Sequence, residues 1–469
     1  MAGDEAPRSG VTAQAPAEDV IAPEPHAPEE PYVHPGRPAD PEVREIRAES
    51  NPLRRIIRIA GPGLIAGAAD DDPSGVGTYA QAGAQFGFAT LWLTVLVLPF
   101  MIAVQYMCAR IALVSGRGLA GTMKRHYPRP VLYAIVLSLV MVNAITAGAD
   151  IGAMAAVGGL FIGLAPVILI VSVAAAMLLL QLFARYAVIA RAFRWLALAL
   201  LAYIFSAILA RPDLTGVIRG AVVPTLSTDP AYIAIVLAVL GTTINPYLFF
   251  WQASQEVEEQ VAKGRHRIWQ RQGASAGELR YRAWDVGIGM FFSQLVAFFI
   301  IVGTGATLYV AGHRNIGSAA EAAQSLTPLA GPLAEALFAV GIVGTGILAV
   351  PVLTASAAYA VAETFDWPSG LDASPARAPE FYGVIALATI AAAAFNFLGI
   401  NPIQALVSAS VVSGLLTPPL LLLLMGVANN RTIMGERTNG RLMNVLGWGM
   451  TAIMGAAALA LIVTIVTGA

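Results

Sequence analysis

The sequence predicts an all-α integral membrane protein with eleven transmembrane helices. Of its 469 residues, 57% are hydrophobic and only 12% are charged, whereas soluble proteins carry about 25% charged residues. The apolar residues gather in windows of about 20, the length needed to cross a bilayer. Lys and Arg collect between alternate windows, as they do in multi-pass membrane proteins. The lipid bilayer is therefore the expected environment of most of the chain.

Eleven apolar windows follow one another along the chain. The fourth and fifth are separated by only a few residues, so their boundary is the least defined. The windows cover residues 59–82, 87–113, 131–157, 160–183, 187–210, 231–254, 284–311, 332–362, 380–399, 402–427 and 442–467.

The positions of Lys and Arg predict the orientation. With the N-terminus in the cytoplasm, 25 of the 28 Lys and Arg residues fall on the cytoplasmic side, and only Arg211, Arg219 and Arg314 fall outside. This bias supports an odd number of spans, because an even number would reverse it midway. We expect a multi-pass protein of the bacterial inner (plasma) membrane.

Two regions differ in composition. Residues 1–50 are rich in Pro, Ala and Glu and have almost no aliphatic run, so they predict a disordered cytoplasmic tail. Residues 51–469 form the predicted eleven-helix domain. Cys108 is the only cysteine, which excludes an internal disulfide and a cysteine metal cluster. Nothing indicates a nucleic-acid partner, an obligate protein partner or a cofactor.

The first window is interrupted by Asp70, Asp71, Asp72 and Pro73. Proline lacks an N–H donor and disfavours a helical conformation in the residue before it. We therefore expect an unwound stretch inside the membrane, where irregular backbone survives only against protein or a water-filled cavity. A carboxylate at that depth is costly, so Asp72 is a functional candidate.

The sixth window contains a matching interruption, Gly241 to Tyr247, in which Asn245 precedes Pro246. The two breaks fall in the first and sixth windows, which are corresponding places in two five-helix halves. Paired interrupted helices of this kind indicate a central binding site in an inverted-repeat transporter.

The residue types at the two breaks suit a hard divalent cation. Asp72 offers a carboxylate, Asn245 an amide oxygen, and Thr242 a hydroxyl or carbonyl oxygen. Oxygen ligands favour magnesium, manganese or calcium over softer metals. The metal ion is thus the expected substrate.

Other intramembrane acids have less certain roles. Asp150, in the third window, is expected either to relay a proton or ion, or to hydrogen-bond a neighbouring helix. Asp70 and Asp71 are expected to line an entry vestibule or to lie at a wet mouth, and not to act as direct ligands.

The stretch from Gly61 through Asp72 and Pro73 to Gly87 resembles the start of NRAMP divalent-metal transporters, and Gly241 to Pro246 resembles their sixth helix. The resemblance extends over about residues 52–467. It implies a leucine-transporter-like fold of inverted repeats with broken first and sixth helices. It also implies uptake of manganese, iron or related ions, usually with protons, and a carbonyl ligand at Ala69.

The departures from the family pattern alter these expectations. Gly75 replaces the asparagine ligand, Asn245 replaces the methionine, Thr242 replaces an alanine, and Tyr247 replaces a histidine. Loss of the thioether makes the chain similar to the NRAMP-related magnesium transporters. In this resemblance Asp150 takes the place of the family's third-helix glutamate, but the arginine partners of that glutamate in the ninth helix have no counterpart here. We therefore expect weak or absent proton coupling, with Asp71, Asp150 and Tyr247 as relay or vestibule residues.

Three functions compete at this point. The first is a divalent-cation importer for Mg2+, Mn2+ or Fe2+ that works by alternating access. The second is a sodium-coupled organic-solute transporter of the same fold. The third is a magnesium-dependent membrane enzyme, which is disfavoured because no Lys or Arg lies between Arg58 and Arg110 to bind phosphates.

Overall fold

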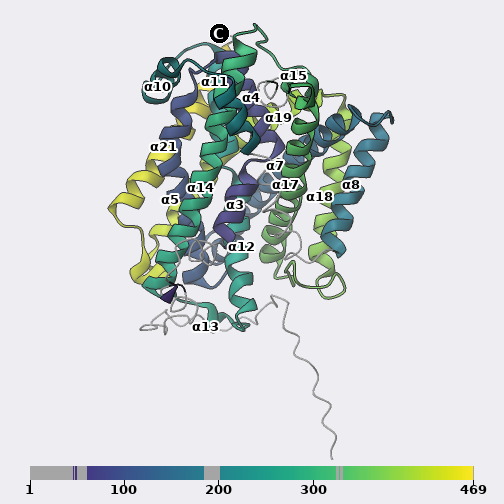
Figure 1. The fold of residues 1–469 in the computed structure, drawn as a ribbon. Helices are drawn as coiled ribbons and strands as arrows, with labels where there is room; N and C mark the ends of the chain where they lie inside the picture. The colour runs from purple at the N-terminus through teal and green to yellow at the C-terminus, as the bar shows by residue number, and fades with distance from the viewer. Residues whose placement is uncertain are drawn as a thin grey trace, which may run out of the picture.

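The structure is a computed structural model that describes residues 61–183, 201–323 and 331–467, together with residues 46, 48, 49 and 327. The predicted tail, residues 1–50, lies almost wholly outside the described residues, as does the first part of the fifth window. Within the described ranges the regular structure is helical, as Figure 1 shows.

The predicted spans are present in order. Nine helices in the described residues are long and apolar enough to cross a membrane. The broken pair α3 and α4 forms the first span, and residues 201–209 are helical at the end of the fifth window. The all-α membrane architecture with eleven spans is therefore confirmed.

The membrane-spanning helices are α3 (Pro62–Asp70), α4 (Pro73–Phe86), α5 (Leu91–Ser115), α7 (Arg129–Gly159), α8 (Pro166–Phe183), α11 (Pro230–Thr243), α12 (Pro246–Ala262), α14 (Ala276–Thr304), α17 (Ala334–Phe365), α18 (Pro379–Phe395), α19 (Pro402–Asn429) and α21 (Arg441–Thr467). A π-helical turn, Gly305–Tyr309, continues α14, and a 3-10 turn, Asn396–Leu398, continues α18. The short connecting helices are α6 (Leu119–His126), α10 (Leu214–Val222), α13 (Ile268–Arg271), α15 (Ala319–Ala323) and α20 (Arg431–Met434), with 3-10 turns at Gly331–Leu333 and Gly435–Arg437.

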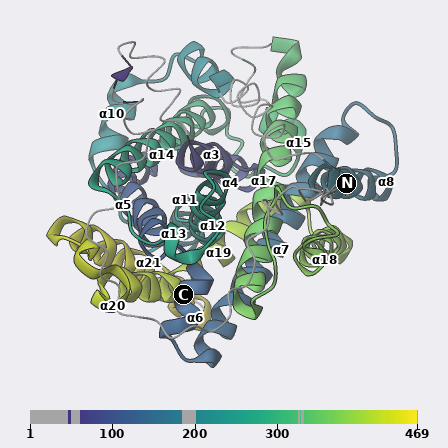
Figure 2. The same cartoon turned by 90° about the horizontal axis from the view of Figure 1, so that it is seen from below.

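The two broken spans lie in the interior of the bundle. Seen along the bundle, α3 and α4 lie near the middle, with α14 on one side and α17 on the other (Figure 2). The second broken span, α11 and α12, packs against α4, α5, α17 and α19. By contrast, α8 and α18 lie together at one edge of the molecule and α21 at the opposite edge (Figure 1). The breaks are thus surrounded by protein, as irregular backbone at membrane depth requires.

A seam of glycines brings α3 and α14 into backbone contact. A methyl group placed on Gly67 would lie 2.2 Å from the carbonyl oxygen of Gly289, and one on Gly63 would lie 2.6 Å from the amide nitrogen of Val286. Small residues allow such close approach between membrane helices. The seam therefore fixes the position of α14 beside the first break.

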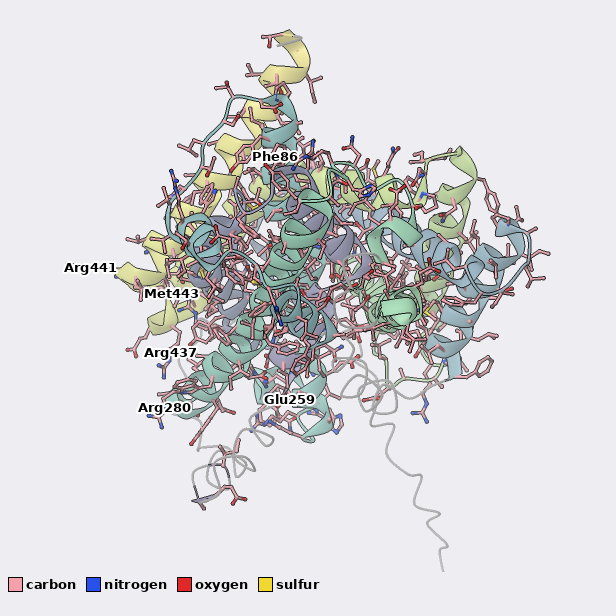
Figure 3. The ribbon with its side chains drawn as sticks, turned by 45° about the horizontal axis from the view of Figure 1, so that its top comes forward. Phe86, Glu259, Arg280, Arg437, Arg441 and Met443 are labelled. Atoms are coloured by element: carbon pink, nitrogen blue, oxygen red, sulfur yellow. The ribbon has the colours of Figure 1, made fainter. Side chains whose placement is uncertain are left out.

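A buried ionic cluster joins α3, α12 and α14 at one end of the bundle. The carboxylate of Asp285 accepts hydrogen bonds from the N–H groups of Gly61 and Gly63, both at 2.8 Å. Arg282 contacts Asp285 at 2.8 Å, Glu256 at 2.7 Å and Glu259 at 2.5 Å. Glu259 and Arg280 lie at the same end of the molecule, away from Phe86 at the end of α4 (Figure 3). This cluster anchors the first half of the first broken span, α3, and the second half of the second, α12, to α14 at that end.

Candidate metal site

The first break places Asp72 at the start of a helix. Helix α3 ends at Asp70, α4 begins at Pro73, and Asp72 is the N-cap residue of α4. Its Oδ1 atom accepts hydrogen bonds from the Gly75 N–H at 2.6 Å and the Ser74 hydroxyl at 2.7 Å. The N-terminal end of a helix also stabilises a negative charge. These contacts stabilise a negative charge on Asp72 in a fully buried place.

The second break places Thr242 and Asn245 beside the first. Helix α11 ends at Thr243 and α12 begins at Pro246. The Asn245 amide oxygen accepts a hydrogen bond from the Ser413 hydroxyl at 3.0 Å, and its amide nitrogen lies 3.5 Å from the Thr242 carbonyl oxygen. The Thr242 hydroxyl is buried and has no hydrogen-bond partner within the described part of the chain. In this conformation Thr242 is thus free to bind a ligand, whereas the Asn245 oxygen is engaged by α19.

Tyr247 connects the two breaks directly. Its hydroxyl donates to the carbonyl oxygen of Ala69 at 2.8 Å and lies 3.3 Å from Oδ2 of Asp72. The side chain is fully buried. The hydroxyl therefore lies between two of the oxygens that the sequence predicted as ligands.

Gly75 marks the place where the Asp72 and Thr242 oxygens approach each other. A methyl group on Gly75 would lie 3.1 Å from the Thr242 hydroxyl oxygen and 3.3 Å from Oδ1 of Asp72. Both oxygens therefore face the same small space beside the α4 backbone. The structure brings together Ala69, Asp72, Thr242 and Tyr247, with Asn245 adjacent on the second break.

Asp150, on α7, is linked to Asp72 through one residue. Its Oδ1 atom accepts a hydrogen bond from the Ser74 N–H at 3.0 Å, and the Ser74 hydroxyl donates to Asp72. The second oxygen of Asp150 has no hydrogen-bond partner among the described residues. This hydrogen bond joins α7 to the start of α4, and a relay role of Asp150 stays a prediction.

Asp70 and Asp71 do not line an open vestibule or lie at a wet mouth in this structure. Both side chains are 0% exposed. The Ser293 hydroxyl on α14 donates to Oδ2 of Asp70 at 2.6 Å and lies 3.4 Å from Oδ1 of Asp71. The glycine seam explains the difference, because it packs α14 directly over the end of α3.

Three serines next to the site were not singled out from the sequence. Ser74 could have been predicted to lie near Asp72, because the residues after an Asp-Pro pair lie in the first turn of a helix that the aspartate caps. Ser293 and Ser413 could not, since each reaches the site from a helix more than 160 residues away. Their roles depend on tertiary packing.

The comparisons with known proteins identify the family. Residues 63–464 match the model of the Nramp family, described as "Natural resistance-associated macrophage protein-like". The chain belongs to the Nramp family. A similar curated protein is the divalent metal cation transporter MntH of Klebsiella pneumoniae strain 342, which is 25% identical over 87% of this chain and 94% of its own length. Family membership makes the chain a membrane transporter and excludes the enzyme alternative.

Solved structures support the fold of this Nramp protein. The manganese transporter of Eremococcus coleocola superposes with a TM-score of 0.69 at 17% identity, covering 89% of this chain and 88% of that chain. Mhp1, a nucleobase-cation-symport-1 family transporter, superposes with a TM-score of 0.54 at 13% identity, covering 86% of this chain and 91% of that chain. Both similarities confirm the expected leucine-transporter-like architecture.

Proposed function

We propose that this Nramp protein transports a hard divalent cation, with Mg2+ preferred over Mn2+ and Fe2+, by alternating access at the paired helix breaks. The observation that carries this proposal is the convergence of oxygen groups from both breaks. Asp72, Ala69, Tyr247 and Thr242 contribute a carboxylate, a carbonyl and two hydroxyls within one buried space. No sulfur belongs to this set.

The charge of the set favours an ion that keeps part of its water. Asp72 is the one carboxylate among these ligands, and the described residues contain no group of three or more His, Cys, Asp or Glu side chains that would form a complete metal cage. Mg2+ dehydrates reluctantly and is commonly bound by one or two carboxylates with several waters. The neutral oxygens would then orient those waters without adding charge.

Binding requires small rearrangements at the site. The Tyr247 hydroxyl would turn from donating to Ala69 and Asp72 to offering its oxygen to the ion. The Asn245 oxygen would exchange the Ser413 hydroxyl for the ion or one of its waters. Both changes occur where the helices are already interrupted, so no helical hydrogen bond is broken. Interrupted helices are also the points about which transporters of this architecture rearrange.

Proton coupling is proposed to be weak or absent. Helix α18 and the turn that follows it, residues 379–398, contain no Lys or Arg, so Asp150 has no basic partner from that helix. The Asp150–Ser74–Asp72 link instead fixes the start of α4. Uptake should therefore depend little on an imposed pH gradient.

The test is uptake by proteoliposomes that contain the purified protein, with Mg2+, Mn2+ and Ca2+ compared with and without a pH gradient. We expect Mg2+ uptake that persists without the gradient. Asn245→Met should shift preference toward Mn2+ or Cd2+, because it adds a soft thioether. Asn245→Leu, of similar size without sulfur, is the matched control. Equal selectivity of the Met and Leu variants would refute the ligand role of Asn245, and absence of Mg2+ uptake would refute the proposed preference.

A further inference from the structure

Asp70 and Asp71 are two further buried acids beside Asp72, and each has one side-chain oxygen without a hydrogen-bond partner among the described residues. Both residues are 0% exposed, and neither forms an ion pair within the described ranges. Oδ1 of Asp70 and Oδ2 of Asp71 are buried without a hydrogen-bond partner among the described residues. An ionised carboxylate at this depth is costly without a partner, so each acid stays protonated unless a positive ion takes the place of its proton.

The backbone around the pair favours a cation. Asp70 is the last residue of α3 and Asp71 is its C-cap, where a helix presents carbonyl oxygens and the negative end of its dipole. Asp72, one residue later, lies at the N-terminal end of α4 and accepts a hydrogen bond from the backbone N–H of Gly75. The chain therefore stabilises the carboxylate of Asp72 itself, but leaves Asp70 and Asp71 beside further negative partial charge.

Ser293 adds a third oxygen to the pair. Its hydroxyl donates a hydrogen bond to Oδ2 of Asp70 at 2.6 Å, and Oδ1 of Asp71 lies 3.4 Å from the same hydroxyl oxygen. This hydrogen bond neutralises neither acid, and the serine oxygen retains lone pairs for a cation. The backbone contact between Gly67 and Gly289, one turn earlier on each helix, holds Ser293 in this place.

We propose that Asp70, Asp71 and Ser293 bind a second divalent cation, which waits beside the central site. Binding would release the proton of each acid, and the two resulting carboxylates would balance the charge of one divalent ion. The position differs from the central site in its partners, because Oδ2 of Asp70 and Oδ1 of Asp71 contact Ser293 on α14, while the oxygens of Asp72 contact Ser74 on α4 and Tyr247 on α12. The proposal extends the proposed function, since the same cargo would occupy both positions in turn.

The test counts bound Mn2+, used alone as a spectroscopic probe, on the purified full-length protein at equilibrium. We expect two Mn2+ ions per wild-type chain, one for Asp70→Asn/Asp71→Asn and one for Asp72→Asn. One ion in both the wild type and the double variant, with none in Asp72→Asn, would overturn the second site and leave the proposed function intact. No binding by any form would contradict both.

Ser293→Ala keeps the proposal testable if the double variant does not fold. This variant retains both carboxylates, so we still expect two bound Mn2+ ions. One of the two should bind about tenfold more weakly, because the loss of one ligand interaction costs about 1.4 kcal/mol. Ser138→Ala, which removes an exposed hydroxyl on α7 that bonds only within its own helix, is the control. Equal affinities of Ser293→Ala and Ser138→Ala for both ions would contradict the assignment.

Discussion

At the scale of the residue, the position of each acid along the broken helix determines what it can bind. Asp72 lies at the N-terminus of α4 and accepts a backbone N–H and a hydroxyl. Asp70 and Asp71 lie at the C-terminal end of α3 and share one serine hydroxyl. Three consecutive residues of identical chemistry therefore have different partners, because the helix axis is interrupted between them.

Gly75→Ala should impair transport by filling the space between Asp72 and Thr242. The added methyl group would lie 3.1 Å from the Thr242 hydroxyl and 3.3 Å from Oδ1 of Asp72. Overpacking of this kind costs about 1–3 kcal/mol, so we expect Mg2+ affinity in the transport assay to fall by about tenfold. Gly287→Ala, on α14, is the control because nothing lies within 4 Å of its added methyl group. Equal uptake kinetics in the two variants would show that the space is not part of the site.

The sequence was sufficient to single out the residues that are marked by their immediate neighbours in the chain. Asp72 and Asn245 could be predicted because each precedes a proline inside an apolar window. The bridging position of the Tyr247 hydroxyl could not, because it requires α12 to cross the end of α3 at a particular angle. The burial of Asp70 and Asp71 also depends on packing, through the contact of Gly67 with Gly289.

At the scale of the element, prolines keep the two spans in separate halves. Pro246 lacks the N–H that would otherwise donate to the carbonyl of Thr242, four residues earlier. Among the described residues, that carbonyl has the long contact to the Asn245 side chain at 3.5 Å in its place. Pro246 therefore removes a helical hydrogen bond that would join α11 to α12. The sequence predicted both breaks for this reason, and the structure confirms them at the expected residues.

Pro246→Ala should slow transport without unfolding the protein. The restored N–H can extend α12 backward by one hydrogen bond, worth about 1 kcal/mol, which favours a continuous helix over the broken one. We expect Mg2+ uptake to fall by about fivefold while the melting temperature in detergent stays the same or rises. Unchanged uptake would mean that the interruption at Pro246 does not contribute to transport.

The cluster around Arg282 should matter for stability. Asp285→Asn removes a buried charge that contacts Arg282 and the start of α3, and breaking a buried ion pair costs about 3–5 kcal/mol. Asp366→Asn removes one partner of the more exposed pair with Lys124, where about 0–1 kcal/mol is expected. Thermal unfolding in detergent should show a clear loss for Asp285→Asn only. Similar melting temperatures for both variants would exclude the cluster as an anchor.

At the scale of the whole molecule, the distribution of Lys and Arg predicts which end faces the cytoplasm. Arg280 and Arg437, from segments far apart in sequence, lie toward the same end of the bundle (Figure 3). That end also holds Glu259 and the cluster around Arg282. The apolar windows, the charge bias and the two breaks were enough to predict the architecture, because each is determined by residues that are close together in the sequence. The contacts between distant helices were not predictable in this way.

Cysteine labelling can test the orientation on a nearly clean background, because Cys108 is the only cysteine and is buried. We expect a membrane-impermeant thiol reagent applied to intact spheroplasts to label His313→Cys but not Arg437→Cys. Both positions are exposed, so permeabilised cells should show labelling of both. The opposite pattern in intact spheroplasts would place the N-terminus outside.

The central claim is that Asp72 at the first break binds the transported cation. Its most direct test is Mg2+ uptake by proteoliposomes with wild-type protein, Asp72→Asn and Asp229→Asn. Asp72 and Asp229 both cap a helix that begins with proline, and asparagine caps about as well as aspartate, so the comparison isolates the buried charge from the capping role. We expect Asp72→Asn to abolish uptake and Asp229→Asn to match the wild type. Uptake by Asp72→Asn at the wild-type rate would show that Asp72 does not bind the transported cation.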